Sequence, residues 1–306
     1  MHQTRRMSAA HIEIRALCAL VSGAISGVPA VPLKGSPRQT ETASLRSTAG
    51  GGGRARAMLL DELSGECHLL ASSLLLVADG VSDCLEVAAT RDNVVNWPVL
   101  TITTRPVLEI AGQIAWLLDD RIDGNERARR YLVWRLADLR DRRLLLRDFQ
   151  ASDDPKALAE IEMQEKELLD AIGAAKWQAA PTIIHPNGDL QAAALADAGG
   201  KREKMPSLTE LVRLVSSTPS VYAMLSISAH GARVGTMYSL NVSEQVDRQG
   251  KRTVQVGGFG LPPNFAIGLT TVAVSLCGRL IAGWNGLDAS GIQRSAVALL
   301  KRAGIA

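Results

Sequence analysis

Apolar residues recur at helical spacing along most of the chain, and this pattern constrains the fold more than any other feature. Leu63, Leu70, Leu74 and Val77, for example, fall on one side of a helix. The chain also holds 42 Ala and 40 Leu against 11 aromatic residues, a balance that favours helices over sheets. We therefore predict an all-α fold, a helical bundle.

The first 57 residues differ from the rest. They are interrupted by several prolines, they end in a glycine run at 50–53, and they carry a net charge of +6, whereas residues 58–306 carry −3. Such a segment buries little apolar surface to offset its ordering entropy. We predict that 1–57 is a disordered extension, whose deletion leaves the melting temperature almost unchanged, and that 58–306 is a single helical domain.

Within that domain, the pattern predicts a first helix that ends near Gly80 and a helix from Pro98 that Pro106 kinks or restarts. Helices over 125–149 and from Pro155 to about residue 172 form a long antiparallel hairpin. A loop is predicted over 178–205.

The C-terminal third begins with a capping-box pattern, Ser207 with Glu210 three residues later. Strand-forming residues around a Gln-Gly turn predict a small β-hairpin near 246–256. The apolar helix 265–284 approaches the length of a membrane span, but Arg279 and three glycines favour a buried core helix, so no membrane association is predicted. A last helix ends at Gly304.

The common signatures of chemistry are absent from the sequence. There is no phosphate-binding loop, no dinucleotide fingerprint, no zinc-protease motif and no nucleophile elbow. The four cysteines are scattered, and the five histidines show no spacing typical of metal ligands. The sequence therefore gives no support for a metal or any other cofactor. The cysteine usage favours a reducing compartment, so we predict a cytoplasmic protein.

Two constellations form the candidate polar centre. Arg105 and Glu109 lie four residues apart on an otherwise apolar helix, where they are either an ion pair that fixes packing or the floor of a cleft. Ser226 and His230 have the same spacing, and an imidazole that titrates near pH ~6.5 suits proton transfer. The alternative for His230 is a helix cap or a satisfied core residue.

A third constellation is a run of arginines on one predicted helix, interleaved with Glu126, Asp138, Asp141 and Asp148. The arginines are Arg127, Arg129, Arg130, Arg135, Arg140, Arg142, Arg143 and Arg147. The interleaved acids favour a solvated, salt-bridged face, whereas a groove for an RNA backbone is the alternative.

Three segments together resemble a family of uncharacterised bacterial helical proteins. They are Arg105–Glu109 with Trp116–Asp119, Pro206-Ser207 with Thr209–Leu211, and Tyr222–Ser226 followed by His230-Gly231. The resemblance covers about residues 58–300 and implies an Arg/Glu helix and a later Ser-x-x-x-His-Gly helix, but no established activity.

The chain is also similar, more weakly, to HEPN-type helical proteins, many of which are metal-independent ribonucleases of defence or toxin systems. Their motif places an arginine four to six residues before a histidine, and no arginine has that spacing before His230. That resemblance therefore requires Arg105 to reach His230 through space.

The sequence leaves two main functions open, and membrane association through 265–284 is a third, less favoured reading. The first is an intracellular helical binding or regulatory protein, with Arg105, Glu109, Ser226 and His230 as its polar centre and a homodimer among its predicted states. The second is a ribonuclease with His230 as general acid or base and Arg105 stabilising phosphate charge. Whether the chain is an enzyme stays open.

Overall fold

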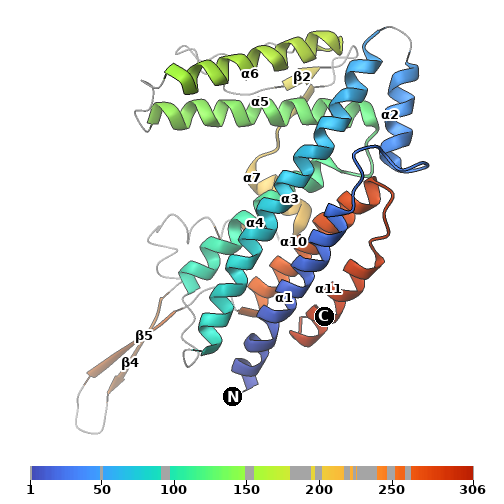
Figure 1. The fold of residues 1–306 in the computed structure, drawn as a ribbon. Coiled ribbons are helices and arrows are strands. Elements are labelled where there is room, and N and C mark those ends of the chain that lie inside the picture. The colour runs from blue at the N-terminus through green and yellow to red at the C-terminus, as the bar shows by residue number, and fades with distance from the viewer. Residues whose placement is uncertain are drawn as a thin grey trace. The chain divides into compact units, whose positions relative to one another are not determined.

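The computed structural model describes residues 2–48, 51–90, 97–148, 155–179, 194–196, 202–216, 221–222, 225, 240–246, 252–258 and 263–305. Most of these residues are helical, which confirms the all-α prediction (Figure 1). The main helices are α1 (His2–Ser26), α2 (Pro37–Ser47), α3 (Gly53–Thr90), α4 (Trp97–Leu117), α5 (Gly124–Asp148), α6 (Pro155–Ala174), α7 (Leu208–Val215), α10 (Pro263–Trp284) and α11 (Ser290–Arg302).

The chain folds into two compact units that interleave in sequence, where we predicted one domain over 58–306. Unit 1 comprises Met1–Ala30, Cys67–Leu118 and Ser207–Ala306, and unit 2 comprises Val31–Glu66 and Asp119–Pro206. The helix α3 begins in unit 2 and ends in unit 1.

The core of unit 1 is built around α10, which contacts α1, α4, α7 and α11. This helix is apolar nearly all round, as expected for a buried helix, and Ala273, Val274, Cys277 and Ile281 are fully buried. Two helical windows, Ala9–Ser26 and Pro263–Trp284, are long and apolar enough to cross a membrane, and 72% of the second is buried inside the protein.

The prediction of a disordered segment over 1–57 is wrong for the described part of that segment. In unit 1, α1 packs on α10 and α11, and it buries Ile14, Leu17, Val21 and Ile25. Some of the prolines and glycines that suggested disorder have structural roles instead.

In unit 2, the Ser36 side chain caps α2, whose first turn contains Pro37, a favoured position for proline. The glycine run lets two segments approach closely. A Cβ atom at Gly52 would lie 2.6 Å from the carbonyl oxygen of Ala175.

One predicted helix boundary is wrong, because α3 continues past Gly80 to Thr90 as one helix. Of the two alternatives predicted at Pro106, a new helix start is excluded, because α4 runs through this residue, and the kink stays a prediction. Apolar residues are buried along the whole length of α3, from Leu59 to Leu85, and this packing outweighs the intrinsic cost of an interior glycine, about 1 kcal/mol.

The predicted long hairpin is present in unit 2, where α5 and α6 contact each other and lie side by side in Figure 1. The N-terminus of α5 is capped by Asp123, whose carboxylate accepts a hydrogen bond of 2.8 Å from the Glu126 amide. The interval 178–205, predicted as a loop, contains three short antiparallel strands, β1 (Gln178–Ala179), β2 (Ala194–Ala196) and β3 (Arg202–Lys204).

The C-terminal predictions agree with the structure. Ser207 and Glu210 form the expected capping box at the start of α7. The predicted β-hairpin is present with longer strands, β4 (Leu240–Val246) and β5 (Arg252–Gly258), paired antiparallel so that Val242 faces Val256. Gly304 adopts φ +72°, a conformation that suits a residue after a helix end.

Candidate functional site

Arg105 and Glu109 form a direct ion pair on α4, as their spacing predicted. The Arg105 Nε atom lies 2.7 Å from Glu109 Oε1, and the two side chains are only 18% and 20% exposed. The pair is thus mostly withdrawn from solvent on a helix that carries no other charged residue.

A third residue, Tyr222, completes this cluster. Arg105 donates a hydrogen bond of 3.1 Å from Nη2 to the Tyr222 hydroxyl, and its guanidinium carbon lies 5.3 Å from the centre of the Tyr222 ring. The hydrogen bond to Glu109 raises the pKa of Arg105 above its ordinary value, against the opposing effect of burial. The arginine is therefore held between a carboxylate and an aromatic face, an arrangement that ties α4 to the segment containing Tyr222.

Ser226 and His230 lie outside the described residues. The structure therefore brings Arg105, Glu109 and Tyr222 together but gives no distance from any of them to His230. The ribonuclease alternative, which needs Arg105 near His230, stays a prediction. The sequence analysis included Tyr222 in a motif but assigned it no role. Arg105 and Tyr222 are far apart in sequence, so only the fold shows that they are in contact.

Breaking the Arg105–Glu109 pair is expected to destabilise unit 1. Arg105→Met or Glu109→Leu alone leaves a partly buried charge without its partner, and we expect each to lower the free energy of unfolding by about 1.5–3 kcal/mol. The double variant should recover much of that loss. Chemical denaturation measures all three values.

The matched control is the exposed pair Arg142–Asp138, which has the same i,i+4 geometry at 2.9 Å. Loss of this pair should lower the free energy of unfolding by only about 0.3–0.5 kcal/mol. Equal losses for both pairs would contradict a structural role for Arg105 and Glu109.

The N-terminal half of α5 carries three arginines whose side chains are largely withdrawn from solvent, where the prediction was a solvated face. Arg127 and Arg129 have side chains only 3% and 2% exposed, and Arg130 is 11% exposed. Arg127 lies 3.1 Å from Glu41 on α2, and Arg130 lies 3.2 Å from Glu203 on β3. This part of the arginine run therefore joins the elements of unit 2.

Asp119 belongs to the same network. Its carboxylate accepts hydrogen bonds from the Arg121 side chain, which lower its pKa, and it lies 3.5 Å from Arg130. Gly124 allows α5 to approach α2 here, because a Cβ atom on it would lie 2.8 Å from the Glu41 Cβ.

The exposed end of the same helix is also ion-paired. Arg140 lies 2.7 Å from Asp141, and Arg143 lies 2.6 Å from Glu165 of α6. The salt-bridged face predicted for the arginine run is therefore present in this half of α5. Paired arginines give little support for the RNA groove, because a phosphate would have to displace the carboxylates.

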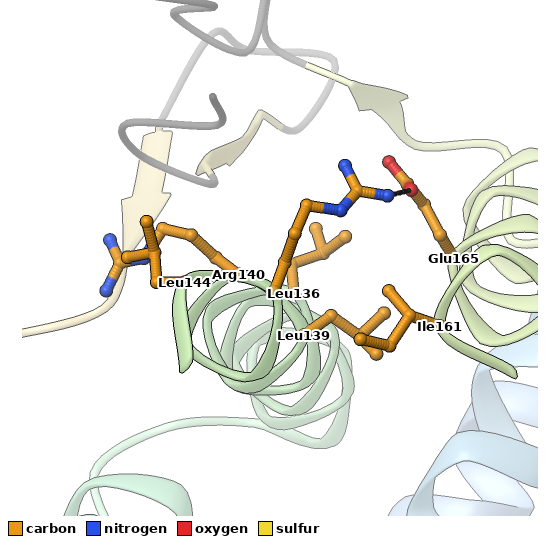
Figure 2. Close-up of a pocket in the computed structure, with 7 residues that line it drawn as sticks. Leu136, Leu139, Arg140, Leu144, Ile161 and Glu165 are labelled. Atoms are coloured by element: carbon orange, nitrogen blue, oxygen red, sulfur yellow. Dashed lines mark hydrogen bonds and ion pairs between the residues drawn. The ribbon is translucent and has the colours of Figure 1, made fainter. Parts of the chain in front are cut away.

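Two hollows lie along the α5–α6 hairpin of unit 2. Figure 2 shows the first, where Leu136 and Leu139 from α5 face Ile161 on α6 beside Glu165. It has a volume of about 20 Å³, which is room for about one water molecule. This hollow is too small for a ligand.

The second hollow is an open groove of about 430 Å³. We call it the hairpin groove. Its lining residues are Arg142, Leu145, Leu146, Ala157, Glu160, Ile161 and Gln164. No sequence pattern marks it, because it depends on the space left between two helices rather than on any motif.

Among the described residues, no group of three or more His, Cys, Asp or Glu side chains could hold a metal ion. The four cysteines all lie in the described part of the chain, and none of them forms a disulfide. Burial raises the pKa of Cys18 to about 12, and it also raises that of Cys277. Thiols of this kind stay protonated at neutral pH and are poor nucleophiles.

No protein-family model, no curated protein and no solved structure matches the chain. The two resemblances noted in the sequence therefore stay predictions.

Proposed function

We propose that the protein is a helical binding module that takes up an apolar segment of a partner in the hairpin groove. The observation that carries this proposal is the groove itself. Its volume of about 430 Å³ falls within the range of about 300–1,000 Å³ found for ligand sites.

The lining of the groove indicates the kind of partner. Its floor is aliphatic, formed by Leu145, Leu146 and Ile161, and Leu145 remains 55% exposed. Covering an exposed leucine in the floor of an apolar hollow with a partner is favourable, because it removes apolar surface from water.

The rim of the groove carries polar side chains that already have partners. Arg142 pairs with Asp138, and Gln164 donates a hydrogen bond to Glu160. With these groups satisfied, binding gains most from apolar contact. The recognition mode supported best is an amphipathic helix laid in a groove between two helices.

A dye titration tests this proposal. We expect 8-anilino-1-naphthalenesulfonate to bind the native protein saturably, and Leu145→Asp to weaken that binding about tenfold, because the charge lies in the apolar floor. Leu169→Asp is the matched control, since Leu169 lies on α6, is 54% exposed and does not line the groove.

Circular dichroism verifies that both variants keep the native helix content. Dye binding that is equally strong in the native protein and in Leu145→Asp would show that the groove is not the binding site.

A further inference from the structure

A second groove lies within unit 1, between α1 and α11, two helices that contact each other (Figure 1). We call it the terminal groove, and its volume is about 360 Å³. Leu17 and Leu299 line it and are only 2% and 1% exposed, so its floor is apolar. Ala16 and Ala298 also line it, and their small side chains leave room between the helices. The volume falls within the range of about 300–1,000 Å³ found for ligand sites.

The charged side chains that line the terminal groove do not balance. Arg302 forms an ion pair of 2.7 Å with Glu13. Arg294 has no such partner in the part of the chain that the structure describes, and its Nη1 atom donates a hydrogen bond of 3.1 Å to the Ser290 hydroxyl. The groove therefore has one positive charge more than negative, and the uncompensated charge belongs to Arg294.

The spacing along α11 puts these groups in order. Arg294, Ala298 and Arg302 are four residues apart in turn, so they share one side of the helix. A helix rises about 12 Å over the eight residues from Arg294 to Arg302. The terminal groove thus has a cation at one end, an apolar middle and a neutral ion pair at the other end.

We propose that the terminal groove binds an aliphatic monocarboxylate, with its carboxylate at Arg294 and its chain over Ala298 and Leu299. A guanidinium presents its N–H groups in a planar fork that matches a carboxylate. Ser295 lies next to Arg294 and also lines the groove, so its hydroxyl can donate a further hydrogen bond. This site is independent of the hairpin groove, which lies in unit 2.

The neutral end of the groove gives the site its selectivity. A second carboxylate at the far end of the ligand would lie near Glu13, and like charges in such a position oppose binding. A dicarboxylate of the same length should therefore bind more weakly than the monocarboxylate. A cationic amphiphile should also bind weakly, because its head group would be repelled by Arg294.

Isothermal titration calorimetry of the full chain tests the proposal. The probe is decanoate below its micellar concentration, since its extended length is close to the rise between the two arginines. We expect saturable binding with a sub-millimolar dissociation constant. Decanedioate and decyltrimethylammonium should each bind at least about tenfold more weakly.

Substitutions in α11 locate the binding site. Arg294→Gln should weaken decanoate binding at least about tenfold, because it removes the charged partner of the carboxylate. Ala298→Leu should weaken it without a change of charge, because the larger side chain fills the groove. Lys301→Gln is the matched control, since Lys301 is an exposed cation of the same helix that does not line the groove. It should leave the affinity unchanged.

A control in unit 2 separates this site from the hairpin groove. Arg142 lines that groove, so Arg142→Gln should leave decanoate binding unchanged. Binding that Arg142→Gln weakens and Arg294→Gln does not would overturn the proposal and place the ligand in the hairpin groove. No saturable binding up to about 1 mM, equal losses in Arg294→Gln and Lys301→Gln, or decanedioate bound as tightly as decanoate would also overturn it. Circular dichroism verifies that each variant keeps the native helix content.

Discussion

Deletion of residues 1–57 is expected to unfold unit 1, not to leave its stability unchanged as the composition of the segment suggests. The deletion removes α1 and with it Ile14, Leu17, Val21 and Ile25, none of which is more than 6% exposed. Burial of one such side chain contributes about 1.5–3 kcal/mol, so four contribute roughly 6–12 kcal/mol. That is comparable with the whole stability of a typical domain, about 5–15 kcal/mol.

The measurement is a thermal melt followed by circular dichroism. The truncated chain should show no cooperative transition from unit 1, while an unchanged melting temperature would mean that α1 does not pack as described. A point variant supports the same conclusion without a truncation. Leu17→Ala should cost about 2–5 kcal/mol. Ile12→Ala, on the same helix but 61% exposed, should change stability by less than about 0.5 kcal/mol.

Gly112→Val is the second substitution with a large expected effect. Gly112 lies where α4 crosses α7, and a Cβ atom on it would lie 2.5 Å from the carbonyl oxygen of Leu211 and 2.8 Å from the Leu211 Cβ. These contacts involve backbone, which cannot move aside as a flexible side chain can. We expect Gly112→Val to lower the free energy of unfolding by about 3 kcal/mol, because the new side chain displaces α7. Gly112→Ala should lower it somewhat less.

Gly23→Ala is the control for this substitution. Gly23 lies in the interior of α1, and a Cβ atom on it would meet nothing within 4 Å. Replacing Gly23 with alanine should raise the free energy of unfolding by about 0.5–1 kcal/mol, because alanine favours the helix. Chemical denaturation should thus give opposite signs for the two alanine variants. Stabilisation by both would show that α4 and α7 do not approach closely.

The candidate site could be predicted only where its geometry is local. The Arg105–Glu109 pair follows from a spacing of four residues on one helix, since such residues share a face. Tyr222, which holds the same guanidinium, comes from a distant part of the chain, and no periodicity connects it to α4. The hairpin groove was also beyond prediction, because its volume depends on how two helices diverge.

The sequence by itself determined most of the helices after residue 57, and it did so through local effects. Helical periodicity marked α10 as a core helix and α5 and α6 as a hairpin, and the Ser207–Glu210 pattern marked the start of α7. These signals arise from contacts within a few residues, so they can be recognised without a fold.

Only the tertiary structure decided which of these segments pack together. It ordered most of residues 1–57, because α1 finds an apolar partner in α10 and Gly52 allows a close approach to Ala175. It also buried Arg127 and Arg129, because Glu41 and Glu203 come from other parts of the chain to neutralise them. In each case the free energy comes from partners far away in sequence, which composition and periodicity do not encode.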